Sequence, residues 1–324
     1  FKLLKSYNKK YPLIIDPVLI FSTYSGSSAM NWGQTATYDN SGHLYAGSIS
    51  FAIGYPTTLG PFQQFFGGGN TDMCITKFST DGTSLIYSTY LGGNGPENPH
   101  SLVVNDNNEL FVFGSTGSPN FPTSTNAYDN TFNGGSSWGF IWNGATYYIP
   151  YPNGTDIVVT KFSSNGNNLL GSTFVGGTGN DGINESGASS YNTSGLCNFY
   201  ADEYRGEIIL DTAGNCYVAS TTNSNDFPVV TASQTNNNGL QDAVVFQLNS
   251  DLSNLIWSSY YGGSQNDAAY SLQINSQGDL YITGGSMSGD LTTTSTSSQP
   301  NYSGGVDGFI AKFDNLNNLS AATY

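Results

Sequence analysis

The side chains that most often perform catalysis are few in this sequence and stand far apart. There are two histidines. His43 occupies a turn position that other parts of the chain fill with different polar residues, namely Glu109, Asn215 and Asp279. His100 follows Pro99 at the start of a short apolar stretch, and no Ser or Cys nucleophile motif surrounds either histidine. We therefore predict no catalytic residue, and too few ligands for a zinc site.

Four aspartates recur at the start of alternating apolar stretches and raise the question of calcium. They are Asp72, Asp156, Asp242 and Asp307, and Asp181 and Asp267 follow glycine pairs in a similar way. No Asp-x-Asp-x-Asp-Gly loop is present, which argues against a calcium site encoded in the sequence. A carboxylate at a strand start accepts backbone N–H bonds in a tight turn. The pattern thus predicts structural acids, with no metal and no cofactor.

The three cysteines differ in their surroundings. Cys74 aligns with Val158, Val244 and Phe309, and Cys216 aligns with leucines, so both are predicted to be buried free thiols. Cys197 lies in a segment without a counterpart elsewhere in the chain. A Cys197–Cys216 disulfide is the less favoured alternative, because Cys216 already has a position in the core.

An aromatic cluster between residues 138 and 151 is the best candidate for binding. Aromatic rings offer flat faces to sugars and anchors to partner proteins. The alternative is a hairpin that packs its own small hydrophobic cluster against the rest of the fold. The candidate residues are Trp138, Phe140, Trp142, Tyr147, Tyr148 and Tyr151.

These residues must be positioned by a repeated unit, because one phrase recurs along the whole chain. The phrase is an apolar run that ends in Ser-Thr-Tyr and a glycine pair, or a close variant of it. Its copies span residues 19–26, 85–93, 169–177 and 255–263, and a last copy begins at Leu319. An Asx-Gly turn with an aromatic strand, a short apolar strand before that turn and the strand that begins at each recurring aspartate complete a unit of four strands.

The unit predicts an all-β fold, a β-propeller of four-stranded antiparallel blades. The recurring acids are farther apart than the roughly 40 to 50 residues that one blade requires, which indicates insertions near 129–153 and 180–206. Such unshared segments often form the binding surface. About four blades are visible, and we expect a larger parent ring. We also expect residues 1–12 to be a linker or the tail of a preceding domain, and 13–324 to be a propeller cut within its last repeat. Residues 13–26 would form a strand that completes the last blade of the ring.

Composition and charge restrict the classes of partner. The formal net charge is -15, and four of the eight basic residues, Lys2, Lys5, Lys9 and Lys10, lie in the first ten positions. A nucleic acid requires a basic face, and so does docking by charge onto anionic lipid. No apolar run approaches the roughly 18 residues of a membrane-spanning helix. We therefore predict neither a nucleic-acid partner nor a membrane-spanning segment.

In their order, these motifs resemble the SBBP family of bacterial β-propeller repeats from about residue 13 onward. The family pattern includes Phe-Pro, seen here at Phe121-Pro122 and Phe227-Pro228, and a lysine in the third strand. That lysine is Lys77, Lys161 and Lys312, with Gln247 as the exception. The resemblance implies an exported protein of Bacteroidetes, often linked to type IX secretion or gliding motility, and no agreed catalytic activity. In that context Asp211-Thr212-Ala213 matches a short O-glycosylation signal and makes Thr212 a candidate for modification.

Together these patterns predict a non-enzymatic module for surface display, adhesion or protein interaction, extracellular or at the cell surface. Its partner would be a protein at the cell surface or outer membrane, a glycan, or the remainder of the parent chain. One alternative is a carbohydrate-active hydrolase or lyase with a site in the central channel, since one fold hosts many functions. A third possibility is a spacer within a multi-domain exported protein.

Overall fold

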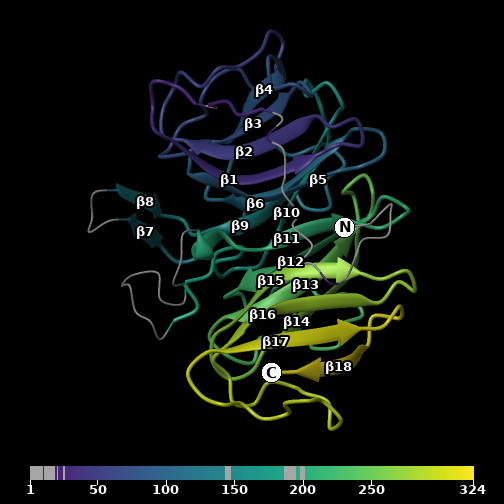
Figure 1. Ribbon diagram of the computed structural model, residues 1–324. Helices are drawn as coiled ribbons and strands as arrows, with labels where there is room; N and C mark the ends of the chain where they lie inside the picture. Colours follow the sequence, from purple (N-terminus) through teal and green to yellow (C-terminus); the bar gives the residue numbers. More distant parts are fainter. Residues whose placement is uncertain are drawn as a thin grey trace.

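The computed structural model describes residues 10, 19, 21–24, 26–142, 147–185, 195–197 and 201–324. Most of the expected strand at 13–26 lies outside these residues, as do residues 1–9. The described chain forms four separate antiparallel sheets of four strands each, which follow one another from top to bottom in Figure 1. This confirms the predicted all-β class and the four-stranded unit.

Each sheet is built from the four predicted strands, joined by turns rich in Gly, Asn and Asp. The first sheet contains β1 (Asn31–Tyr38), β2 (Leu44–Ser50), β3 (Asp72–Phe78) and β4 (Leu85–Leu91). The second contains β5 (Glu97–Val104), β6 (Leu110–Thr116), β9 (Asp156–Phe162) and β10 (Leu169–Val175). The third contains β11 (Glu207–Leu210), β12 (Cys216–Thr222), β13 (Asp242–Leu248) and β14 (Leu255–Tyr261). The fourth contains β15 (Asp267–Ile274), β16 (Leu280–Ser286), β17 (Asp307–Phe313) and β18 (Leu319–Thr323).

One expectation about the repeat is wrong in detail. The sequence pattern placed Leu319 at the start of a further unit, yet β18 pairs with β17 and is the fourth strand of the fourth sheet. The same holds for β4, β10 and β14, so the Ser-Thr-Tyr phrase ends each sheet rather than beginning one. The recurrence of the phrase does not show which strand comes first in a sheet, because any of the four strands could begin a repeating unit.

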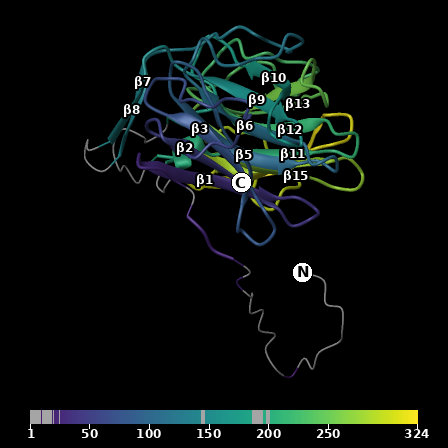
Figure 2. The same cartoon turned by 90° about the horizontal axis from the view of Figure 1, so that it is seen from above.

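The hydrophobic core lies in layers between neighbouring sheets. Met73 and Ile75 of β3 pack with Val158 and Phe162 of β9, and similar layers lie between the second and third and between the third and fourth sheets. The first strands contact one another in order, β1 with β5, β5 with β11 and β11 with β15. Figure 2 shows β5, β11 and β15 side by side. The sheets therefore pack face to face like propeller blades, with their first strands on the inside.

The far face of the fourth sheet is less covered than its counterparts. The fourth position of the third strand is Ile75, Val159 and Val245 in the first three sheets, and each of these side chains is fully buried. Its counterpart Ile310 is 54% exposed. The fourth sheet thus keeps a large aliphatic residue at this position, but no further sheet covers it within the described chain.

The two expected insertions lie where the spacing placed them. Residues 129–153 contain the extra hairpin β7 (Trp138–Trp142) and β8 (Tyr147–Tyr151), which projects from one side of the molecule in Figures 1 and 2. The second insertion precedes β11 and includes the short 3₁₀ helix η1 (Asp202–Tyr204). Residues 186–194 and 198–200 of this insertion lie outside the described part of the chain.

Candidate functional site

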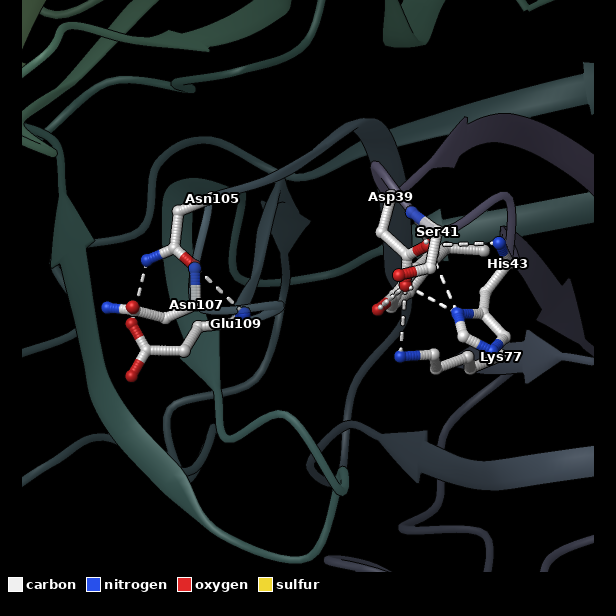
Figure 3. Close-up of polar contacts among 8 residues, drawn as sticks. Asp39, Ser41, His43, Lys77, Asn105, Asn107 and Glu109 are labelled. Carbon is white, nitrogen blue, oxygen red and sulfur yellow. Dashed lines mark hydrogen bonds and ion pairs between the residues drawn. The ribbon is translucent and has the colours of Figure 1, made fainter.

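The turn between the first and second strands is stabilised by its first residue in every sheet. Asp39 Oδ1 accepts hydrogen bonds from the backbone N–H groups of Ser41 (3.0 Å) and His43 (2.9 Å), and Asn105 does the same for Asn107 and Glu109 (Figure 3). Asp211 and Asn275 repeat the arrangement. His43 is thus a half-buried turn residue whose Nδ1 lies 2.9 Å from Asp39 Oδ2.

The recurring lysine of the third strand forms an ion pair with this turn. Lys77 Nζ lies 3.2 Å from Asp39, Lys161 2.8 Å from Glu109 and Lys312 2.8 Å from Asp279. The third sheet has Gln247 in place of lysine and Asn215 in place of the acid. In the third sheet the turn acid Asp211 instead accepts a hydrogen bond from Asn215 Nδ2 at 2.9 Å, so the polar contact there lies within the turn itself.

The Ser-Thr-Tyr phrase attaches the fourth strand to the loop between the second and third strands. The hydroxyls of Tyr90, Tyr260 and Tyr324 accept the backbone N–H groups of Tyr55, Phe227 and Leu291 at 2.8, 2.9 and 3.0 Å. The neighbouring Ser and Thr hydroxyls donate to carbonyls of the same loop, for example Ser258 to Pro228 at 2.7 Å. The contacts also show that Tyr55-Pro56 is the first sheet's Phe-Pro element, which the sequence pattern did not reveal because its aromatic residue is tyrosine.

The recurring aspartates accept backbone N–H groups, as predicted. Asp156 accepts the N–H groups of Asn133 (2.7 Å) and Gly134 (3.0 Å). Asp72, Asp242 and Asp307 accept those of Gly67 (2.6 Å), Asn238 (3.1 Å) and Ser303 (2.6 Å). Their repetition therefore reflects a loop that each carboxylate organises.

A second acid from the next sheet lies near each of the first three. We call Asp72–Glu97, Asp156–Asp181 and Asp242–Asp267 the junction pairs, and all six side chains are fully buried. Glu97, Asp181 and Asp267 accept the N–H of the second glycine in the preceding Gly-Gly turn, at 3.2, 2.7 and 2.7 Å. Glu97 matches Asp181 and Asp267 in this role, although the sequence analysis did not group it with them.

The glycine pair is explained by this crowding. A Cβ on Gly92 would lie 2.5 Å from Glu97 Oε2 and 2.7 Å from Asp72 Cγ. A Cβ on Gly176 would lie 2.8 Å from Asp181 Oδ2 and 2.9 Å from Asp156 Oδ1. Two carboxyls thus occupy the space that a side chain at the first glycine would need.

Burial raises the pKa of the junction acids. It raises the pKa of Asp72 and Asp242 to about 7, and with the added charge of Asp181 it raises the pKa of Asp156 to about 8. The ion pairs that the described lysines and Arg205 form are with acids outside the junction pairs. Asp72, Asp242 and Asp267 each have one buried oxygen without a hydrogen-bond partner. Burial without a counter-ion favours the protonated form.

The described residues contain no group of three or more His, Cys, Asp and Glu side chains that could hold a metal ion. In the same part of the chain, no helix is long and apolar enough to cross a membrane.

All three cysteines are buried free thiols. This confirms the prediction for Cys74 and Cys216 and excludes the alternative of a Cys197–Cys216 disulfide in this structure. The Cys197 thiol donates to the backbone carbonyl of Asn184 at 3.2 Å.

The candidate aromatic cluster divides into two parts. Tyr151 is fully buried, and Trp138 packs against it with 5.6 Å between ring centroids, as part of a cluster with Ile49 and Ile149. These contacts are those of a hairpin that packs against the sheets, and they leave Tyr151 no face for a ligand. The side chains of Phe140, Trp142, Tyr147 and Tyr148 lie outside the described part. Thr212, the candidate modification site, is exposed in the turn between β11 and β12.

The inner strands line a cavity of about 640 Å³, which we call the axial cavity. All four sheets contribute to its wall. Its lining includes Gln34 of β1, His100 and Ser101 of β5, Arg205 and Glu207 at the start of β11, and Ser271 of β15. A central channel is predicted only for the enzymatic alternative, and none of these residues is among the candidate site residues predicted from the sequence. The signal that pointed here was the unshared segment 180–206, at the end of which Arg205 stands.

Two titratable side chains in the wall are already engaged. His100 Nε2 lies 3.0 Å from Ser115 Oγ, and burial lowers the pKa of this histidine to about 3, so the ring is neutral at physiological pH. Glu207 Oε2 accepts hydrogen bonds from the Ser271 hydroxyl and from Leu272 N–H, the latter at 2.9 Å. Glycoside hydrolysis by the common mechanisms uses two carboxyl groups that face the substrate. Glu207 is the one acidic residue that lines the described cavity.

No protein-family model and no curated protein matches the chain. Among solved structures, it is similar to a protein of unknown function from Dyadobacter fermentans, at 13% identity and a TM-score of 0.43 over 94% of this chain and 71% of that one. It is also similar to the NanB sialidase of Streptococcus pneumoniae, at 10% identity and a TM-score of 0.47 over 97% and 55%. An α-L-arabinofuranosidase of Clostridium thermocellum gives 11% identity and a TM-score of 0.33 over 90% and 70%. The chain thus spans about half of the sialidase, and these similarities concern the fold.

Proposed function

We propose that this protein is a non-enzymatic binding module whose ligand site is the axial cavity. The carrying observation is that one cavity is bordered by all four sheets and by an unshared segment. The repeated polar groups are largely engaged in holding each sheet together and joining it to the next. The cavity wall instead includes side chains that differ from sheet to sheet, such as Gln34, His100 and Tyr270, which share one strand position. Concave sites with a few convergent polar groups are the usual place for a ligand.

The hydrogen bonds of Glu207 favour binding without turnover over hydrolysis. Its carboxylate accepts two hydrogen bonds from β15, and it has no acidic partner among the described residues of the cavity wall. His100 is neutral and held by Ser115. A general acid and a general base must both reach the substrate, and this wall offers neither in a free state.

We further propose that the chain is an SBBP-type propeller that acts in an exported or cell-surface protein, as an adhesion, display or protein-interaction module. Type IX secretion or a gliding-associated role would fit that context. The support is the recurrence of the Ser-Thr-Tyr, Gly-Gly, Phe-Pro and third-strand lysine motifs in one order. Its partner would be a surface glycan or protein, or the rest of the parent chain.

The test combines a glycan array, a hydrolysis and lyase screen and a localisation measurement. We expect ligands to bind the intact chain without being cleaved, and a substitution in the cavity wall such as Gln34→Trp to abolish that binding. Turnover of any bound glycan would overturn the non-enzymatic proposal. Binding that survives Gln34→Trp would move the site away from the cavity. Recovery of the native protein from the cytoplasm alone would overturn its proposed export.

A further inference from the structure

The wall of the axial cavity contains the single arginine of this sequence. Arg205 stands in a chain with formal net charge -15, at the end of the segment 180–206 that the other units lack. The other seven basic residues are lysines, and four of these lie in the first ten positions. Because the repeated unit has no arginine at this place, we look for the role of Arg205 in the cavity itself.

The guanidinium group is held from two sides. Its Nε lies 3.1 Å from Oδ1 of Asp202, whose side chain is 4% exposed. Its central carbon lies 5.5 Å from the ring centroid of Tyr270. That tyrosine is itself fixed, because its hydroxyl donates to the Leu196 carbonyl at 3.0 Å and accepts from Asn184 Nδ2 at 3.2 Å. The planar group is therefore pre-oriented, which reduces the entropy lost when it binds a ligand.

Half of this side chain nevertheless remains open to solvent. The Arg205 side chain is 51% exposed, and its ion pair with Asp202 engages Nε. A guanidinium carries five N–H donors in one plane, and its terminal nitrogens match the two oxygens of a carboxylate. Arg205 therefore offers a pre-oriented double donor at the cavity wall.

Arg205 is the one positively charged side chain in the described wall of the cavity. His100 is neutral because burial lowers its pKa to about 3, and Glu207 is turned toward Ser271 and Leu272 N–H. The other polar side chains of the wall include Gln34, Ser101 and Thr283, which are uncharged. Such groups hydrogen-bond hydroxyls, and the wall has no large aliphatic side chain that would receive an apolar residue of a peptide.

We propose that the axial cavity binds an acidic sugar, with its carboxylate on Arg205 and its hydroxyls toward the uncharged polar wall. A cavity of about 640 Å³ is in the range that holds a ligand of one or two sugar rings. This inference rests on the proposed function, since it names the ligand class of the same site.

The experiment is calorimetric titration of the intact chain with digalacturonate and with galactobiose, the matched neutral disaccharide. We expect digalacturonate to bind about 10- to 100-fold more tightly, because a charge-assisted double hydrogen bond is lost with the neutral sugar. Arg205→Gln should remove that preference. Arg205→Lys, which keeps the charge and loses the fork, should reduce it about tenfold. The matched control is Lys312→Gln, which removes a positive charge from β17 and should change neither affinity.

The outcomes separate this inference from the proposed function. Equal binding of both sugars, unaffected by Arg205→Gln, overturns the carboxylate site and leaves a glycan-binding cavity. If a peptide with a free C-terminal carboxylate binds more tightly than digalacturonate, the assignment of the ligand as a sugar is overturned. Failure of both sugars to bind, with a ligand from the array still bound in the cavity, overturns the acidic sugar alone. Should Arg205→Gln lower the melting temperature, Arg205→Lys still decides the question, since it keeps a positive charge beside Asp202.

Discussion

The sheet junctions and the axial cavity use polar residues in opposite ways. At the junctions, the same residue types recur in three places, they are fully buried, and each acid accepts hydrogen bonds from the neighbouring loop. Around the cavity, several residues differ from sheet to sheet, such as Gln34, His100 and Tyr270 at one shared strand position, and Arg205 keeps half of its side chain exposed. Repetition in this chain therefore marks residues that hold the sheets together. The absence of repetition marks the surface on which a ligand can act.

The largest effect is expected from filling the space at a junction. Gly92→Ala would place a methyl group 2.5 Å from Glu97 Oε2 and 2.7 Å from Asp72 Cγ, so we expect a loss of about 3 kcal/mol in the free energy of unfolding. Urea denaturation measures it. The control is Gly33→Ala in β1, where a Cβ would meet no atom within 4 Å. Similar stability of the two variants would contradict our account of the glycine pair.

The next effect is a dependence of stability on pH. Burial raises the pKa of the junction acids, to about 7 for Asp72, Asp181 and Asp242 and to about 8 for Asp156, whereas an unfolded aspartate has a pKa near 4. The folded state therefore binds more protons between these values, and stability must fall as pH rises from 4 to 8. We expect the free energy of unfolding to be lower at pH 8 than at pH 5, by about 1 kcal/mol or more for each junction pair.

Two variants assign this pH dependence to the junctions. Asp242→Asn should reduce the difference between pH 5 and pH 8, because the amide cannot ionise. Asp81→Asn should leave the difference unchanged, since Asp81 is exposed and its hydrogen bonds lower its pKa to about 2, outside this range. Stability that is constant or rises between pH 5 and pH 8 would show that the junction acids are ionised in the fold.

A smaller effect is expected from the fourth strand. Tyr260→Phe removes a hydroxyl that donates to the Ser224 carbonyl and accepts from Phe227 N–H, both at 2.9 Å. We expect a loss of about 1 to 2 kcal/mol, because both buried backbone groups lose this partner. Tyr38→Phe, at an exposed position at the end of β1, is the control with an effect near zero. Equal effects in a thermal denaturation assay would mean that the recurring tyrosine does not hold the loop.

The smallest effect on stability is expected at Thr212, a repeated turn position that is also the candidate modification site. The residue is exposed, so Thr212→Ala should leave the melting temperature unchanged. Mass spectrometry of the protein from its native host should show the peptide with an added glycan mass. An unmodified peptide would remove Thr212 from the candidate sites and would strengthen the rule that repeated positions here are structural.

Most of the fold could be predicted from the sequence, because each strand carries its own local signal. The Asx-Gly turns, the alternating strand after each recurring aspartate and the Ser-Thr-Tyr run gave four strands per unit and a structural role for Asp72 and its equivalents. The role of Glu97 was missed, since its longer side chain hides its equivalence to Asp181. The sequence also did not show that the Ser-Thr-Tyr strand is the last of its sheet and not the first.

The cavity could not be predicted in the same way. Gln34, Arg205 and Glu207 come together only because the first strands of different sheets contact one another, and no local pattern records which strand lies inside. The aromatic cluster drew attention by its density, yet the ring of Tyr151 is buried. The more useful signals were an insertion without a counterpart and a single arginine in it.

The junctions also determine how the molecule should come apart. Each Gly-Gly turn links a sheet only to the next one along the chain, so the four sheets behave as a row of units coupled to their nearest neighbours. The first and fourth sheets each have such a link on one side only, and the fourth sheet also has Ile310 exposed on its far face. Hydrogen exchange should therefore be fastest in β15 to β18 and slower in the second and third sheets, in a graded series instead of one cooperative step.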